Sequence, residues 1–187
     1  DLEERAARIA IERANVSLDS IDLILTNRTP TEHQLTNGAC ELHHRLGLPV
    51  RSFALQIEGA QHSFLLQLSM ARAMIAAGLA TTALLVQSSG VSRLLDYSDV
   101  FSLAFGDGAT AVVVGRVECG HGVLAATHYT DGEKPHTLVA SVPGASWYAE
   151  GRSIFHLTDL DGMANIILRT VDLTSSSITD ALAAAAL

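Results

Sequence analysis

The sequence predicts an α/β layered fold, in which helices cover a central mixed β-sheet and one helix is buried. Helical stripes of apolar residues alternate along the chain with short, almost wholly apolar runs. Such runs are typical of parallel strands that are covered on both faces. One helical segment, residues 63–77, carries small residues on several faces, which favours a buried position. A glycine-containing turn and a further apolar run end the alternation, as expected for a layered α/β domain.

The elements of the first half follow from periodicity and from helix stop signals. Apolar residues recur at helical spacing between Leu2 and Ala14. Gly47 and Pro49 mark the end of a second helix, and Gly78 ends a third. The predicted order is helix 2–14, buried strand 21–26, loop 27–34, helix 36–46, strand 50–57, helix 63–77 and buried strand 83–87.

Turns are more frequent in the second half of the chain. Residues 88–100 form a polar loop that is long enough to have a function. In the run 105–111 (FGDGATA), Gly106 and Gly108 flank Asp107, which predicts unusual backbone dihedral angles. The elements expected beyond it are strand 112–114, a strand at 122–128, a turn-rich stretch at 131–143, a turn at residues 151–152, and helical segments 163–171 and 178–187.

Amino-acid composition and net charge exclude some classes of protein for this chain. Of the 187 residues, 48% are apolar and only 17% are charged, whereas about a quarter are charged in a typical domain. This predicts a surface that is largely buried in a partner, or a fold that lacks a part. The net charge of −8 and the scattered Lys and Arg residues argue against binding of nucleic acid. Arg72 and two threonines interrupt the most apolar stretch, 70–86, so no membrane span is expected.

No metal site, cofactor or secretory signal is expected from the sequence. Cys40 and Cys119 are far apart and form no CxxC pair. The eight histidines lack the spacing of a zinc site. The first residues do not form a signal peptide, and two reduced thiols are typical of a cytoplasmic protein, which is the expected location.

Three blocks of the sequence resemble the ketoacyl-ACP synthase III branch of the thiolase-like superfamily. Residues 46–48 (LGL), followed by 55–64 (LQIEGAQHSF), resemble the segment that leads into the family's catalytic cysteine. The FGDGATA run at 105–111 resembles the family's FGDGAGA motif and is the most specific of the three. Residues 151–155 (GRSIF) resemble a later G-R-x-x-F turn. The resemblance implies a thiolase-like layered fold, of which this chain covers only part.

The resemblance also implies an organisation and a chemistry. Residues 1–115 would form the N-terminal thiolase-like half, incomplete at its start, and 116–187 the connecting segment and the start of the C-terminal half. Family members transfer an acyl group from coenzyme A or an acyl carrier protein to a cysteine, and a decarboxylated malonyl carrier then attacks it. The expected partners are therefore acyl-CoA or carrier-protein thioesters in fatty-acid or specialised-metabolite biosynthesis. A homodimer, or a heterodimer with a homologous subunit, is expected through an edge strand near residues 83–86.

Gln61 stands where the family has its nucleophilic cysteine, and an amide cannot replace a thiol as a nucleophile. Nearby, Gln56, Glu58, His62 and Ser63 also depart from the family's pattern, which favours natural divergence over an engineered Cys→Gln exchange. Three functions are compatible with Gln61. The chain is an acyltransferase whose acyl-enzyme step is altered or lost, a non-catalytic partner of a cysteine-bearing homologue, or a decarboxylase of malonyl carriers.

The other candidate residues each have a functional and a structural interpretation. His62 is a base or an oxyanion donor, or simply a helix cap. Ser63 would need an oriented base to replace the nucleophile, and Glu58 is either a general base or a cap. Arg28 and Arg152 are candidates for contact with a phosphate of coenzyme A or of a carrier arm, or ordinary surface arginines. The residues expected to be structural at the site are Phe64, Gly106, Asp107 and Gly108.

Overall fold

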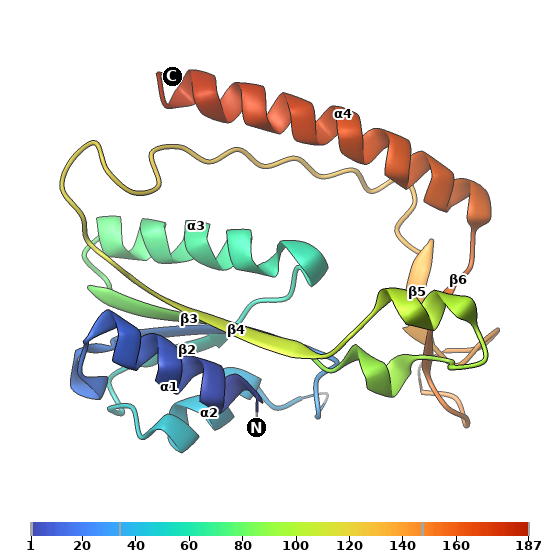
Figure 1. The fold of residues 1–187 in the computed structure, drawn as a ribbon, viewed down its shortest axis with the longest axis horizontal. Coiled ribbons are helices and arrows are strands. Elements are labelled where there is room, and N and C mark those ends of the chain that lie inside the picture. Colours follow the sequence, from blue (N-terminus) through green and yellow to red (C-terminus); the bar gives the residue numbers. More distant parts are fainter. Residues whose placement is uncertain (1, 34, 147, 187) are drawn as a thin grey trace. The chain divides into compact units, whose positions relative to one another are not determined.

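The computed structural model describes residues 2–33, 35–146 and 148–186 and divides the chain into two compact units (Figure 1). The first, here called the sheet unit, comprises Asp1–Ser92 and Ala104–Cys119. The second, the helix unit, comprises Arg93–Leu103 and Gly120–Leu187. One border between the units follows Cys119. The sequence predicts instead that the N-terminal half ends at residue 115, and this division stays a prediction.

The sheet unit is built on a four-stranded mixed sheet, as the sequence predicts. Its strands lie in the order β2-β1-β3-β4, with β1 parallel to both neighbours and β4 antiparallel to β3. The elements of this unit are α1 (Leu2–Ala14), η1 (Leu18–Ser20), β1 (Leu23–Thr29), α2 (Gly38–Leu46), β2 (Phe53–Gln56), η2 (Ala60–His62), α3 (Ser63–Ala76), β3 (Thr82–Ser89) and β4 (Gly108–Gly115).

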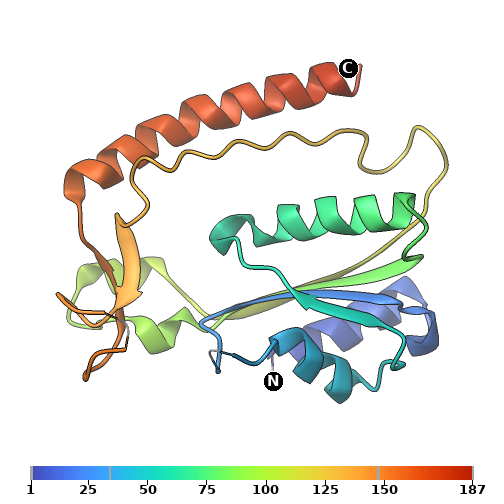
Figure 2. The same ribbon diagram turned by 180° about the vertical axis from the view of Figure 1, so that it is seen from behind.

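Helices cover both faces of this sheet. Helices α1 and α2 lie on one face and α3 lies on the other (Figures 1 and 2). Because successive side chains of a strand point to opposite faces, Ile24 of β1 packs under α1 and α2, while Leu23 and Leu25 pack with Ala71 and Ile75 of α3. The sheet is therefore buried on both sides, which explains the nearly continuous apolar runs of β1 and β3.

Helix α3 is apolar on more than its sheet side. Ala71 and Ile75 are buried against the sheet, whereas Phe64, Leu65 and Met70 are exposed. A helix that is apolar on several faces suits an inner layer of a fold. The sequence predicts this position for residues 63–77, and the structure shows the helix covered by the sheet on one side.

Several predicted boundaries differ from the observed ones because pairing in the sheet decides them. Residues 27–29, predicted as loop, belong to β1 because they pair with 87–89 of β3. Residues 50–52, predicted as strand, precede β2 as a turn and pair with no strand. The helix predicted to begin at residue 36 begins at Gly38, where the side chain of Asn37 accepts a hydrogen bond from the backbone N–H of Ala39 and caps α2.

The expectation of an edge strand near residues 83–86 is wrong. These residues lie in β3, which pairs with β1 on one side and β4 on the other. All of its backbone groups along this stretch face partners within the sheet, so it offers no free edge to a second subunit. The edges of the four-stranded sheet are β2 and β4. The dimer itself stays a prediction.

The helix unit contains an antiparallel strand pair and one long helix. Its elements are η3 (Val91–Leu94) and η4 (Val100–Ala104), which straddle the borders of the unit, β5 (Leu138–Ser141), β6 (Ile154–Leu157) and α4 (Leu160–Ala184). Strand β5 lies within the stretch 131–143 that is predicted to be rich in turns.

The two helical segments predicted at 163–171 and 178–187 form the single helix α4, as far as residue 184. The gap left between the two predicted segments, residues 172–177, is wrong because the helix is continuous through it. Within this helix, Thr179 Oγ1 donates to the carbonyl of Ser175 at 3.0 Å. Leu187 lies outside the described residues.

The strand predicted at 122–128 is also wrong, because a strand requires a ladder partner. The segment instead runs extended beside α4 within the helix unit (Figure 2). Side-chain bonds hold it there, since Thr127 Oγ1 donates to the carbonyl of Ser177 at 3.0 Å and the hydroxyl of Tyr129 donates to Asp180.

Candidate functional site

The turn between β2 and α3 has a strained backbone. Ile57 continues from β2 and donates its N–H to the carbonyl of Thr26 at 2.8 Å. The chain then passes through the short helix η2 and enters α3 at Ser63. At the start of η2, Ala60 has φ 46°, in the left-handed region that residues with a Cβ avoid. A left-handed alanine costs about 1 kcal/mol or more, so the surrounding contacts must hold it.

Two side chains hold this turn from the strand side. Glu58 Oε1 accepts the N–H of Ala60 at 3.0 Å, and its Oε2 accepts from Asn27 Nδ2 at 3.0 Å. The same amide nitrogen of Asn27 donates to the carbonyl of Ile57 at 3.2 Å. Asn27 is 5% exposed and lies in β1, so it anchors the turn to the sheet. We call Asn27, Glu58 and Ala60 the turn brace.

The helix side of the turn is held by Ser63. Its hydroxyl donates to the carbonyl of Ala60 at 2.8 Å and accepts from the N–H of Gly59 at 3.0 Å. Ser63 is only 2% exposed. The proton and the oxygen of this hydroxyl are both engaged with the backbone, so the geometry gives no support to Ser63 as a replacement nucleophile.

Gln61 and His62 lie between these two supports, and both are exposed. The side chain of His62 makes no capping hydrogen bond to the first turn of α3, which argues against its interpretation as a cap. Within the described part of the chain, no hydrogen bond of the Gln61 side chain is found. Gln61 therefore presents its amide to solvent, just before the first turn of α3, where free N–H groups and the helix dipole favour a carbonyl or an anion. Phe64 follows in the first turn of α3 and is partly exposed.

Replacing Ala60 by glycine tests the strain at this turn. Because glycine adopts positive φ without a steric penalty, we expect Ala60→Gly to raise the free energy of unfolding by up to about 1 kcal/mol. Ala10→Gly, within α1, is the matched control and should lower it by about 1 kcal/mol. Urea denaturation shows whether each change raises or lowers the free energy of unfolding. A loss of stability in Ala60→Gly would contradict the assignment of strain.

The loop before β4 is fixed by a carboxylate. Asp107 Oδ1 accepts the N–H of Ser92 at 2.9 Å and its Oδ2 accepts the Ser92 hydroxyl at 2.6 Å. Gly106 and Gly108 do not have positive φ, so a left-handed backbone is not the reason for these glycines. A Cβ built on either glycine meets no atom of the chain within 4 Å. Within this chain, neither sterics nor backbone strain explains the two glycines.

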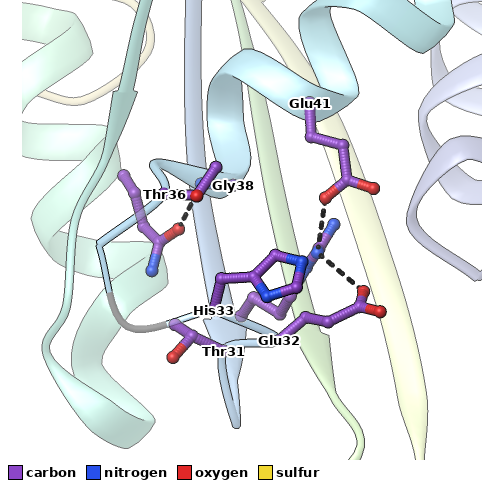
Figure 3. Close-up of a pocket in the computed structure, with 8 residues that line it drawn as sticks. Thr31, Glu32, His33, Thr36, Gly38 and Glu41 are labelled. Atoms are coloured by element: carbon purple, nitrogen blue, oxygen red, sulfur yellow. Dashed lines mark hydrogen bonds and ion pairs between the residues drawn. The ribbon is translucent and has the colours of Figure 1, made fainter.

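A small polar pocket lies beside β1 and α2, on the face of the sheet that α1 and α2 cover (Figure 3). Arg28 dominates it. Its Nε donates to Glu3 Oε1 at 3.0 Å and its Nη1 donates to Glu41 Oε2 at 3.0 Å, while Glu32 lies 3.9 Å away. The residues that line the pocket are Arg28, Thr31, Glu32, His33, Thr36, Gly38, Glu41 and Gln56.

The carboxylates around Arg28 compete with any anionic ligand. Glu3 is 3% exposed and binds the guanidinium through both oxygens, and the hydroxyl of Ser88 donates to the same carboxylate. The hydrogen bond to Glu3 raises the pKa of Arg28 further above its ordinary value, although burial opposes the rise. A phosphate would have to displace these acids, so the geometry gives no support to the predicted phosphate contact of Arg28, which stays a prediction.

The pH dependence of stability reports on this pocket. The hydrogen bond from Arg28 lowers the pKa of Glu41 below its ordinary value of 4.5, against the opposing effect of burial. A lowered pKa in the folded state stabilises the fold above the ordinary pKa, and this contribution is lost as the pH falls through the folded value. We therefore expect stability to fall below about pH 4.5 more steeply in the parent chain than in Glu41→Gln. Parallel slopes in urea denaturation from pH 6 to 3 would contradict this.

Arg152 lies in the helix unit and has a structural contact. Its Nη2 donates to the carbonyl of Leu95 at 3.0 Å and, more weakly, to that of Arg93 at 3.4 Å. These bonds tie the segment 93–103 to the turn before β6. The predicted role of Arg152 in phosphate binding stays a prediction.

A chain of polar side chains, which the sequence does not reveal, joins α3 to the sheet. Gln67 is fully buried, donates to the carbonyl of Val86 at 3.4 Å and accepts from the amide of Gln87. Gln87 in turn accepts from the hydroxyl of Thr110 at 3.0 Å. The only hint in the sequence is a glutamine in an otherwise apolar helix. Asn27 was missed because strand pairing, rather than local sequence, places it beside the turn.

The described residues contain neither a metal-binding cluster nor a helix that could span a membrane. Among residues 2–33, 35–146 and 148–186, no group of three or more His, Cys, Asp or Glu side chains is arranged to hold a metal ion. No helix in the same ranges combines the length and apolar character needed to cross a bilayer.

The strand–turn–helix segment lies in the part of the chain that is similar to known proteins. A family model described as 3-oxoacyl-[acyl-carrier-protein (ACP)] synthase III matches residues 55–132, a range that includes both the β2–α3 turn and the FGDGATA loop. A beta-ketoacyl-[acyl-carrier-protein] synthase III from Alkalilimnicola ehrlichii is 37% identical over 133 residues, which cover 71% of this chain and 41% of the relative. Over these ranges the chain is similar to proteins described as 3-oxoacyl-ACP synthases III.

Solved 3-oxoacyl-ACP synthases III have the same fold as this chain. The enzyme from Pseudomonas aeruginosa aligns with a TM-score of 0.84 and 29% identity, over 100% of this chain and 56% of the other. The enzyme from Aquifex aeolicus aligns with a TM-score of 0.84 and 25% identity, over 99% of this chain and 56% of the other. The thiolase-like fold expected from the sequence is thus confirmed. The chain spans about half the length of the synthase III relatives it matches.

Proposed function

We propose that this chain carries the thioester site of a 3-oxoacyl-ACP synthase III, with Gln61 in place of the nucleophilic cysteine. The observation that carries the proposal is the position of Gln61, exposed between the end of β2 and the first turn of α3, inside the segment that matches the synthase III family. The proposed ligands are acyl thioesters of coenzyme A or of an acyl carrier protein, in fatty-acid or specialised-metabolite biosynthesis. Both are compatible with a cytoplasmic location.

The chemistry of Gln61 follows from its amide. A carboxamide donates through its NH₂ group and accepts through its oxygen, but it forms no thioester. At the start of α3 it can therefore bind a thioester carbonyl without becoming acylated. The acyl-enzyme step at residue 61 is lost, while binding of the thioester is retained.

Loss of the acyl-enzyme is tested by mass spectrometry after incubation with acyl-CoA. Trypsin releases residues 52–72 as one peptide, which contains Gln61 and lacks both cysteines. We expect no acyl adduct on this peptide, and an adduct there would overturn the proposal. Peptides with Cys40 and Cys119 serve as internal controls for non-specific acylation, because both thiols are exposed.

Retention of thioester binding is tested by calorimetry with acetyl-CoA and with an acetylated carrier protein. Gln61→Trp fills the space before α3 with an indole, and we expect it to weaken binding at least tenfold without changing the melting temperature. Leu35→Trp, at a side chain that is 99% exposed in the same unit, is the control. No binding by the parent chain, or equal binding by Gln61→Trp, would overturn the proposal.

The exposed amide of Gln61 favours decarboxylation of a malonyl thioester as a second candidate activity. In this reaction the bond between the carboxylate and the α-carbon breaks, carbon dioxide leaves, and a proton from water completes the acetyl thioester. The protein only has to bind the thioester carbonyl, which stabilises the enolate. Release of labelled carbon dioxide from malonyl-CoA or a malonyl carrier tests this activity, with Gln61→Ala as control.

Exposed apolar side chains of α3 favour the third candidate, a partner subunit. Phe64, Leu65 and Met70 are exposed there, and β2 and β4 are sheet edges. A homodimer, or a heterodimer with a cysteine-bearing homologue, would bury such surfaces. Co-purification with that homologue, and synthase activity only in the mixture, distinguishes the partner role from the other two.

A further inference from the structure

The carboxylate of Glu58 is held beside Ala60, the residue that precedes Gln61. Its two oxygens accept separately from Ala60 N and Asn27 Nδ2, each at 3.0 Å. No ion pair of Glu58 is found among the residues that the structure describes. Within the described ranges, therefore, no cation pairs with the negative charge of Glu58 at the turn.

This charge opposes the field of α3. The first N–H groups of a helix favour an anion, and enzymes use that field to lower the pKa of a thiol. A fixed carboxylate nearby disfavours a second anion and raises the pKa of such a thiol. The carboxylate also occupies the N–H of Ala60, a donor adjacent to residue 61.

We propose that Glu58, positioned by Asn27, makes the β2–α3 turn unfavourable for an anion at residue 61 and so suits it to a neutral amide. This inference rests on the proposed function and deepens it. The site differs from a thiolate site in its electrostatics as well as in its nucleophile. A cysteine placed at residue 61 is therefore less reactive beside Glu58 than it is when Glu58 is neutralised as well.

The test introduces the thiol and measures its pKa. Gln61→Cys and Gln61→Cys/Glu58→Gln are alkylated with iodoacetamide from pH 6 to 10, and the adduct is followed on peptide 52–72, which then contains a single cysteine. At an effective dielectric constant of about 40 to 80, as for a charge pair that is largely in solvent, a like charge about 6 Å away shifts a pKa by about half a unit to one unit. We expect Glu58→Gln to lower the thiol pKa by that amount and to raise the alkylation rate at pH 7 about three- to tenfold.

Three further variants complete the test. Glu12→Gln, at an exposed glutamate of α1, should leave the thiol pKa unchanged. Asn27→Ala, which frees the carboxylate to move into solvent, should lower it by less than Glu58→Gln does. His62 follows the thiol directly in sequence, and repeating the comparison with His62→Gln replaces its imidazole with a neutral amide.

An unchanged thiol pKa in Glu58→Gln, with a melting temperature equal to that of Gln61→Cys, would overturn the inference. An unchanged pKa in Asn27→Ala would overturn the part assigned to Asn27. Because alkylation requires no thioester substrate, the inference can fail while thioester binding stands. Conversely, loss of thioester binding would leave the pKa result intact.

Discussion

Replacing Arg28 by methionine is expected to lower the free energy of unfolding by about 3 kcal/mol. The change removes the cation from the buried carboxylate of Glu3, which is 3% exposed and also accepts the hydroxyl of Ser88. Removing one partner of a buried ion pair is among the costliest single changes in a folded protein. Glu3 comes from α1, Arg28 from β1 and Ser88 from β3, so the same change loosens the helix from the sheet.

Urea denaturation followed by circular dichroism measures this loss. Arg5→Met, at an exposed arginine of α1, is the matched control and should change stability by less than about 0.5 kcal/mol. The double variant Arg28→Met/Glu3→Gln removes both charges and should recover about half of the loss, because the two sites are coupled. A loss below about 1 kcal/mol in Arg28→Met would show that water, rather than the ion pair, solvates Glu3.

Replacing Leu25 by alanine is expected to lower the free energy of unfolding by about 2–5 kcal/mol. Leu25 is fully buried in β1, where it lies opposite Leu55 of β2 and Leu85 of β3 and packs in the cluster beneath α3. The truncation removes apolar contacts and leaves a cavity that the flanking strands cannot fill. Because α3 rests on this cluster, the position of Gln61 is also affected.

Two measurements on Leu25→Ala distinguish a loss of stability from a change in the position of Gln61. Leu35→Ala, at a leucine that is 99% exposed, should be within about 0.5 kcal/mol of the parent chain. At a temperature where Leu25→Ala remains folded, we expect its affinity for acetyl-CoA to fall at least threefold. Unchanged stability would contradict the packing of this core, and unchanged affinity would show that Gln61 keeps its position without Leu25.

Local patterns predicted the architecture but could not predict its boundaries. The apolar runs of β1 and β3 reflect burial on both faces, so periodicity and composition located both strands. The ends of β1 depend on pairing with 87–89, residues some sixty positions away, which no local pattern encodes. The same limit produced the strand predicted at 122–128, because apolar character alone cannot supply a ladder partner.

The candidate site, like the fold, could be predicted only in part from the sequence. The motif around residue 61 located the turn, because a strand, small residues and an alanine-rich helix follow one another in sequence. Asn27 and Gln67 were not recognised, since each acts through a contact with a distant segment. Arg28 was predicted to be a ligand contact from its charge alone, and only the structure shows the acids that surround it.

The segment 93–103 has a consequence for synthesis of the chain. It is flanked on both sides by parts of the sheet unit, yet it belongs to the same compact unit as residues much later in sequence. Arg152 bonds to Leu95 across 57 positions, and the ring of Phe101 lies 6.1 Å from that of Phe155. At about 5–20 residues per second, a ribosome needs roughly 3–11 s to add those positions. During this interval β4 can already pair with β3, whereas Phe101 cannot yet contact Phe155. Its segment is then accessible to chaperones and proteases.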